Sequence, residues 1–181
     1  MLGQINRITG HDSEFMKHNT IDALQDVAIS DDAEYGTGCT ISDLWTIEDA
    51  LNVRLPSEYK TFLLNMGWYE GQHISLFGIA PYPFRHLNVL NVIISERTAR
   101  PALPTTLIPV MNVGNGDLYC LNISKANTSP VVLWSHESAS DQEYSLISQS
   151  FDAFIRELIL THYPTLAPSD DDENELRRGG S

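Results

Sequence analysis

Two neighbouring runs organise this chain: Ile108-Pro-Val-Met-Asn-Val-Gly-Asn-Gly-Asp-Leu-Tyr-Cys-Leu-Asn-Ile-Ser124 and Ser129-Pro-Val-Val-Leu-Trp134. Together they predict a three-stranded β-meander. Asn115-Gly116 supplies two residues that tolerate positive φ, which is what a type I′ hairpin turn requires. Pro109 lacks an N–H, so little is expected to pair with the outer side of the first strand there. The third strand, 131–134, is therefore expected to pair with the second.

The type I′ turn also predicts the register of the hairpin. Gly114 would face Asp117, and each opposite pair would share one face of the sheet. The predicted pairs are Val113 with Leu118, Met111 with Cys120, Val110 with Leu121, Ile108 with Ile123, and Pro109 with Asn122. Both faces of the hairpin are then partly apolar.

Composition limits the classes of partner. The chain has 181 residues with 42% hydrophobic content, enough for one globular domain with its own core. Its 24 acidic and 11 basic residues give a net charge of −13. This charge opposes binding to nucleic acid or an anionic membrane and favours a basic partner, although acidity is also a common device for solubility.

The two cysteines and the absence of an apolar leader predict a cytoplasmic protein. Cys39 and Cys120 are the only cysteines, and Cys120 falls within a predicted strand, where a free thiol packs as a small hydrophobe. This usage fits a reducing compartment. No run approaches the roughly 18 apolar residues of a membrane span.

The remaining elements follow from periodicity and from turn residues. Helices are predicted over 20–28, between Ser42 and Asn52 with Ser42 or Thr46 as the cap, from Pro56 to Gly67, and from Ser150 to Pro164. The segment 87–97 favours a helix, although its β-branched residues also suit a strand. Strands are predicted over 73–79 and 141–147, and Trp68-Tyr-Glu-Gly71 is predicted to be a turn that exposes two aromatic side chains.

These elements divide the chain into three parts. Residues 1–39 are predicted to be an N-terminal extension with one short helix, and 40–166 to be a single α+β domain. Residues 167–181 are predicted to be a disordered acidic tail, because Ser169-Asp-Asp-Asp-Glu-Asn-Glu175 has no apolar anchor. The final Arg-Arg-Gly-Gly-Ser could be an expression remnant.

The sequence does not predict an active site. The six histidines show no paired metal-ligand spacing, so no metal-binding residue is proposed. Gly114-Asn-Gly116 lacks the third glycine and the following helix of a dinucleotide-binding motif. His136-Glu137 could in principle form an acid/base pair with Asp117 or Glu48, but nothing in the sequence places them together. No catalytic or cofactor-binding residue is predicted.

The ordered set of segments resembles the SUKH superfamily, which includes bacterial immunity proteins and a fungal regulator of cell-wall synthesis. The resemblance runs from about Ile41 to Leu160. It comprises a helix with Glu48, then Leu51-Asn-Val-Arg-Leu-Pro-Ser-Glu-Tyr-Lys-Thr-Phe-Leu63, Phe77-Gly-Ile79, Leu107-Ile-Pro-Val110, Gly116-Asp-Leu-Tyr-Cys-Leu121, Pro130-Val-Val-Leu-Trp-Ser-His-Glu137 and the helix from Ser150. Asn122 and Trp68-Tyr69 depart from the residues these proteins usually carry.

The resemblance implies an α+β fold, with helices packed on a mostly antiparallel sheet built around the central β-meander, and no catalysis. The first expectation is an immunity protein that neutralises a cognate bacterial toxin, of nuclease type and therefore basic. The alternative is an intracellular regulatory module with no toxin partner. The residues predicted to bind a partner are Trp68, Tyr69, Glu70, Asp117 and Glu137, because Trp and Tyr are enriched among interface hot spots. Trp68 and Tyr69 could equally fold back onto the core.

Overall fold

The computed structural model describes residues 19–99, 101–124, 129–137 and 144–166. Seven strands form one antiparallel sheet in which sequence order equals spatial order. The strands are β1 (Glu34–Tyr35), β2 (Tyr69–Glu70), β3 (Ser75–Leu76), β4 (Leu107–Asn112), β5 (Leu118–Asn122), β6 (Val131–Trp134) and β7 (Ser145–Ser148). The helices are α2 (Thr20–Asp31), α3 (Ile41–Leu51), α4 (Ser57–Asn65), α5 (Val89–Thr98) and α6 (Phe151–His162), with 3-10 turns η1 (Arg85–Leu87) and η2 (Pro164–Leu166).

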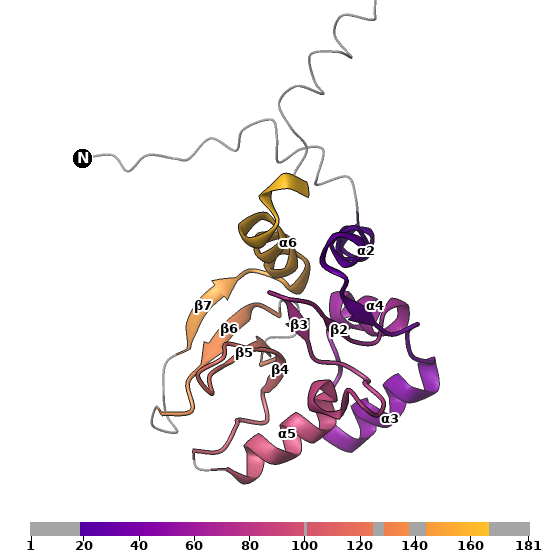
Figure 1. Cartoon of the computed structure of the whole chain (residues 1–181). Coiled ribbons are helices and arrows are strands. Elements are labelled where there is room, and N and C mark those ends of the chain that lie inside the picture. The colour runs from indigo at the N-terminus through magenta and orange to yellow at the C-terminus, as the bar shows by residue number, and fades with distance from the viewer. Residues whose placement is uncertain (1–18, 100, 125–128, 138–143, 167–181) are drawn as a thin grey trace, which may run out of the picture.

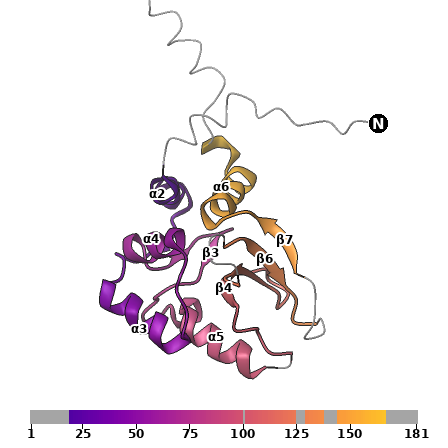
Figure 2. The same ribbon diagram turned by 180° about the vertical axis from the view of Figure 1, so that it is seen from behind.

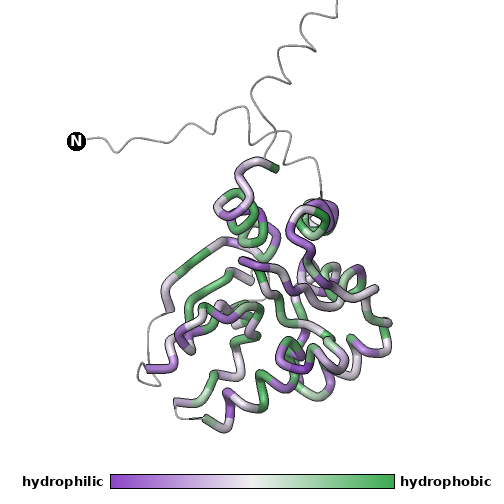
Figure 3. Tube along the Cα trace, in the orientation of Figure 1, coloured by the Kyte–Doolittle hydropathy of each residue, from purple (hydrophilic) through white to green (hydrophobic). Residues whose placement is uncertain are grey.

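The helices surround the sheet unevenly. In Figure 1, α3 and α4 lie on the side away from β6 and β7, and the reverse view in Figure 2 agrees. The α2 and α6 helices pack against each other at one end of the molecule, and α5 packs against β4. Strands β4 to β6 are largely hydrophobic in the colouring of Figure 3, whereas α2 is partly hydrophilic. The predicted α+β class is therefore confirmed.

The β4–β5 hairpin forms, but its predicted register and turn type are wrong. Asn112 pairs with Leu118, and the Val113 amide donates to the Asp117 carbonyl oxygen at 3.0 Å, which leaves a three-residue loop instead of two. Gly114 and Gly116 have positive φ, at 103° and 97°, and Asn115 does not, so the turn is not type I′. Gly114 adopts positive φ as readily as Gly116 does, and this allows a loop one residue longer than the predicted one.

A β-bulge shifts the register a second time. Pro109 pairs with Cys120 and Met111 with Tyr119, so Val110 is the extra residue on β4. Consecutive residues of β4 are buried from Leu107 to Val110, because both faces of the strand are covered at this point. The predicted pairing contained no bulge, so it assigned Ile108 and Pro109 to the wrong partners on β5.

The neighbours of the hairpin match the prediction on one side only. Strand β6 pairs with β5, as predicted. The outer side of β4 is nevertheless occupied, since β3 pairs there at Leu76 and Met111, and the Phe77 amide donates to the Val110 carbonyl oxygen at 2.9 Å. These contacts lie just beyond Pro109, so the proline limits the length of the pairing but does not prevent it.

All the predicted helices form, and in one of them the capping residue differs from the predicted one. Thr40, and not Ser42 or Thr46, caps α3 in a reciprocal capping box with Asp43. The 87–97 segment is a helix, α5, whose Asn88 cap accepts from the Asn91 amide. Ser150 caps α6 as predicted, and η2 begins at Pro164. The strand predicted over 73–79 is shorter, at Ser75–Leu76, and part of the 141–147 segment lies outside the described residues.

Aromatic residues connect α4, α6 and the sheet in the core. Tyr59, Phe62 and Phe151 are fully buried, with ring centroids 5.3 to 6.0 Å apart. The Tyr59 hydroxyl donates to the Phe77 carbonyl oxygen at 2.8 Å, which satisfies its one buried polar atom. The helical stripe predicted for Phe62 is thus confirmed as core.

Helix α2 belongs to this core. Leu24 and Val27 of α2 are fully buried, and α2 packs on α6. Asp31 at its C-terminal end accepts hydrogen bonds from the Gln72 amide and the Tyr163 hydroxyl, both at 2.7 Å. These contacts attach α2 to the β2–β3 turn and to the end of α6. The predicted acidic tail, 167–181, lies outside the described residues.

Candidate partner-binding surface

The two aromatic residues predicted as exposed anchors are buried, so that prediction is wrong. Trp68 is 6% exposed and its ring stacks on Phe84 with a centroid distance of 4.2 Å. Tyr69 is fully buried in β2, where it pairs with Tyr35 and its ring stacks on the Tyr35 ring at 6.3 Å. Neither side chain can serve as a hot spot without unfolding of the loop.

Glu70 of the same predicted loop is partly exposed. It lies directly opposite Glu34 in the β1–β2 pair, and its Oε1 atom is 2.7 Å from Nε2 of His86. It also borders a groove of about 390 Å³ between α5 and the sheet, whose floor includes the buried Phe77 and Leu118. Glu70 therefore remains available at the surface, although without its aromatic neighbours.

Asp117 and Glu137 lie near each other at the open end of the β5–β6 pair. Asp117 Oδ1 accepts from the His136 backbone amide at 3.1 Å and lies 2.8 Å from His136 Nδ1. The hydrogen bond with the His136 side chain holds the pKa of Asp117 below its ordinary value, despite partial burial. Glu137 is exposed, with Oε1 3.9 Å from His136 Nε2. Glu48, the other candidate for an acid/base pair, has its own partners on α4 and in the connection between α3 and α4, and it takes no part in this cluster.

The distribution of charge identifies a different region. Residues 19–53, called here the acidic segment, contain no lysine, arginine or histidine, and they form α2, β1 and α3. Six of their carboxylates are exposed, and they lie on the two helices and the edge strand: Asp22, Asp26, Asp32, Glu34, Asp43 and Asp49. Figures 1 and 2 place α2 and α3 on the side of the molecule away from β6.

Large apolar side chains are exposed among these carboxylates. They are Ile29 on α2, Tyr35 on β1, and Ile41 and Trp45 on α3. Scattered single apolar residues are normal on a protein surface. A tryptophan that is 65% exposed within an acidic segment is less usual, because Trp buries a large area when it finds a partner. Exposed aromatic residues are enriched at protein interfaces, and the carboxylates around them would select a partner of positive charge.

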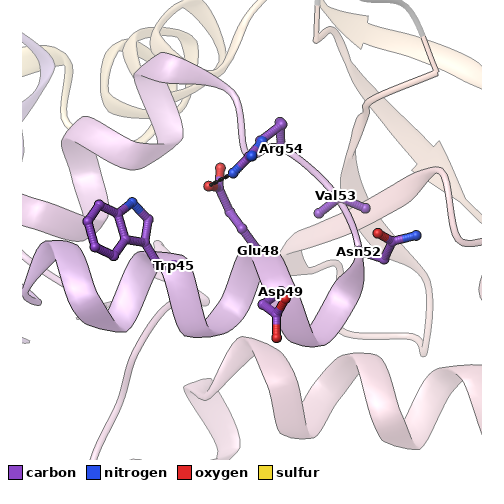
Figure 4. Close-up of a pocket in the computed structure, with 6 residues that line it drawn as sticks. All are labelled: Trp45, Glu48, Asp49, Asn52, Val53 and Arg54. Carbon is purple, nitrogen blue, oxygen red and sulfur yellow. Dashed lines mark hydrogen bonds and ion pairs between the residues drawn. The ribbon is translucent and has the colours of Figure 1, made fainter.

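Trp45 borders an open depression of about 560 Å³ at the C-terminal half of α3 (Figure 4). Asp49, Asn52 and Arg54 also line it, together with Glu48 and Val53. Ile41, Trp45 and Asp49 follow one another at four-residue spacing, so they share one side of the helix. Leu44 and Ile47 occupy the opposite, buried side.

Glu48 fixes the floor of this depression. Its carboxylate is 4% exposed and lies 2.7 Å from Lys60 Nζ and 3.0 Å from Arg54 Nη1, while the Leu55 amide donates to it at 2.8 Å. Burial alone would raise the pKa of Glu48, but the hydrogen bonds from Lys60, the Leu55 amide and Arg54 outweigh it and lower the pKa. Glu48 therefore ties α3 to α4 and is not itself available to a partner.

Sequence reasoning missed Trp45, although a signal was present. The helical stripe over Leu44, Ile47 and Leu51 leaves Trp45 off the apolar face. A tryptophan on the polar side of an amphipathic helix is a candidate for an interface. The structure thus places Trp45 and Asp49 on one side of α3, and Glu70 opposite Glu34 in the β1–β2 pair. Asp117 and Glu137 lie at the open end of the β5–β6 pair, three strands along the sheet from β2.

Comparison with known proteins identifies the family. A family model described as SUKH_6, SMI1-KNR4 cell-wall, matches residues 41–155. The chain belongs to the SUKH superfamily. A solved protein from Pseudomonas syringae pv. tomato has a TM-score of 0.50 and 21% sequence identity to this chain, covering 76% of this chain and 94% of the other. At this identity the likeness shows the fold alone. No curated protein matches.

The SUKH match begins at the first residue of α3 and ends within α6. Helix α2 and strand β1, which belong to the acidic segment, therefore lie before it. Within the described ranges no three His, Cys, Asp or Glu side chains are arranged to hold a metal ion, and no helix there is long and apolar enough to cross a membrane.

Proposed function

We propose that this SUKH protein is a cytoplasmic immunity protein that binds and neutralises a cognate toxin domain, basic and of nuclease type, without catalysis of its own. The observation that carries the proposal is the acidic segment: exposed carboxylates on α2, β1 and α3, no basic residue, and four exposed apolar side chains among them. Membership of a superfamily that includes immunity proteins supports the same role.

Electrostatics would speed the encounter. A nuclease must bind phosphates, so its active surface is rich in Lys and Arg. A protein of net charge −13 attracts such a surface at long range and can raise the association rate well above the roughly 10⁵–10⁶ M⁻¹s⁻¹ of a neutral pair. Covering the phosphate-binding surface with carboxylates would block the substrate.

Slow dissociation needs desolvated contacts as well as charge. The exposed Ile29, Tyr35, Ile41 and Trp45 provide apolar area within the same segment. The fixed Glu48 bridge between α3 and α4 would keep the helix rigid, so that little order has to be gained on binding.

The test compares two variants with equal net charge. Asp32→Asn/Glu34→Gln removes two carboxylates of the acidic segment, and Glu96→Gln/Glu157→Gln removes one carboxylate from α5 and one from α6, outside that segment. Each is co-expressed with the toxin domain encoded beside the gene, and growth rescue and association rate are measured at two salt concentrations. We expect the first pair to slow association several-fold at low salt and the second to have little effect.

A different outcome would change the proposal. Equal slowing by both variants would show that net charge, and not the acidic segment, attracts the partner. No binding of any neighbouring toxin by the wild-type protein would favour the second function, an intracellular regulatory module. The family description, which names SMI1-KNR4 and the cell wall, favours this second function over an enzyme.

A further inference from the structure

Two exposed aromatic side chains differ in one respect. Tyr82 is 80% exposed, and the Arg85 guanidinium lies over its ring, 5.7 Å from the centroid. Trp45 is 65% exposed, and within the described ranges no Lys or Arg lies over its ring. Indole is the aromatic ring that binds cations best. Trp45, the ring that binds cations better, is therefore the one without a cation over it among the described residues.

The two carboxylates near Trp45 also differ in whether a cation of this chain is paired with them. The charge of Glu48 is matched by Lys60 and Arg54. Asp49, one helical turn beyond Trp45, is exposed and pairs with no cation among the described residues. Both side chains border the depression in Figure 4, with Asn52 on its far side. The depression thus has an open aromatic ring and an unmatched negative charge together.

We propose that the depression beside α3 receives one Lys or Arg side chain of the partner, which stacks on the Trp45 indole while its charged end pairs with Asp49. This deepens the proposed function and rests on it. Asn52 would accept a further hydrogen bond through its side-chain oxygen. The site has a volume of about 560 Å³, enough for such a side chain with some water.

The position of Arg54 favours a cation that arrives from the Trp45 side. Arg54 is 86% exposed but its Nη1 atom is held by Glu48, so its charge lies over the Glu48 end of the depression. Trp45 is about one turn away from Glu48 towards the start of the helix. An incoming cation can therefore reach the indole while Arg54 stays paired, and no internal ion pair has to break.

Substitutions at position 45 separate a cation site from a simple apolar contact. Trp45→Phe keeps an aromatic face, whereas Trp45→Leu keeps apolar area without one. With the neighbouring toxin domain as the probe, we expect Trp45→Leu to weaken binding about 3- to 30-fold more than Trp45→Phe does. Asp49→Asn should weaken binding as well. Tyr82→Leu, the matched exposed aromatic control, should bind like the wild type.

The partner's cation is found by replacing exposed Lys and Arg residues of the toxin domain with Gln, one at a time, in wild-type and Trp45→Leu backgrounds. One replacement should weaken binding to the wild type and have much less effect on the variant. Trp45 is exposed whereas Trp68 and Trp134 are buried, so acrylamide quenching reports on it directly. Quenching should fall when the complex forms.

The outcomes are distinguishable. Equal binding by Trp45→Leu and Trp45→Phe, or no coupling to any partner cation, would overturn the cation site while leaving the proposed function in place. Absence of binding by the wild type would instead remove the proposed function. Because Trp45 lies outside the core, each variant should keep the wild-type melting temperature, which serves as the folding control.

Discussion

Trp68 and Trp45 show opposite fates for the same residue type. Trp68 follows α4 in a loop, where exposure was expected, yet its ring stacks on Phe84 inside the core. Trp45 lies within a regular amphipathic helix, where burial would be usual, yet its ring is open to solvent. Local element type therefore does not determine exposure in this protein.

The difference arises from what surrounds each backbone. Gly67 has a φ of 79°, which turns the chain back after α4 so that Trp68 and Tyr69 enter the sheet. The Trp68 carbonyl oxygen then accepts from the Gly36 amide beside β1. Helix α3 instead has core contacts on one side only, at Leu44 and Ile47. Its outer side, at Ile41, Trp45 and Asp49, is exposed in the part of the chain that the structure describes.

The strongest test of this comparison is Trp68→Ala. Removing a buried indole should lower the free energy of unfolding by about 3–5 kcal/mol, because a cavity remains beside Phe84. Urea unfolding followed by circular dichroism measures this loss, with Trp68→Phe as a milder control. A loss below about 1 kcal/mol would mean that the ring does not contribute to the core.

Gly116→Val tests the hairpin that organises the sheet. A β-branched residue at a φ of 97° is strained, and a Cβ atom there would lie 2.8 Å from the His136 ring. We expect a loss of about 1–3 kcal/mol, seen as a lower melting temperature. Gly114→Val also has a positive φ to satisfy but no atom within 4 Å, so comparing the two variants separates backbone strain from the His136 contact.

Glu48→Gln tests whether the depression beside Trp45 has a fixed floor. A neutral amide can still accept from the Leu55 amide, but it loses the charge that holds Lys60 and Arg54. The expected cost is about 1–2 kcal/mol, since both cations can partly rehydrate. Asp49→Asn, the neighbouring exposed carboxylate, should leave chemical denaturation unchanged within about 0.5 kcal/mol.

Asp117 should make a smaller, pH-dependent contribution. Its hydrogen bond with the His136 side chain lowers its pKa in the folded state, so the folded protein is stabilised above the ordinary carboxyl pKa. That stabilisation is lost as the pH falls through the lowered pKa. Asp117→Asn should therefore reduce stability at pH 6 and much less at pH 2.5, measured by melting at both pH values. An equal loss at both would exclude an ionised Asp117 as its source.

Trp45→Ala should have the smallest effect on the fold and a large one on binding. The side chain is mostly exposed, so the free energy of unfolding should change by less than about 0.5 kcal/mol. Affinity for the proposed toxin partner should fall about 30-fold or more if Trp45 is a hot spot, as calorimetry would show. Trp68→Phe is the opposite control, because it alters the core and leaves the outer side of α3 intact.

Much of the fold could be predicted from local sequence. Helix periodicity identified α3, α4 and α6, and the Asn-Gly and Gly residues located the β4–β5 turn. The register failed because Gly114 and Gly116 both allow positive φ, so two loop lengths were available to the same residues. The bulge at Val110 has no local signal, because it depends on the contacts of β4 with β3 and β5.

The candidate surface was less predictable than the fold. Of the residues chosen from sequence, Glu70, Asp117 and Glu137 keep some exposure, whereas Trp68 and Tyr69 are core. The aromatic content of the loop predicted an anchor, but aromatic residues supply core and interface area equally well. Which of the two applies depends on whether another element covers them.

Local sequence was enough to predict the helices, the α+β class, the acidity and the resemblance to the SUKH superfamily, because helix periodicity, turn chemistry and charge depend on neighbouring residues. Which tryptophan is exposed could be learned only from the packed fold. Burial depends on residues distant in the chain, such as Phe84 against Trp68, and on which side of α3 meets the core. The surface offered to a partner is what remains after that packing is complete.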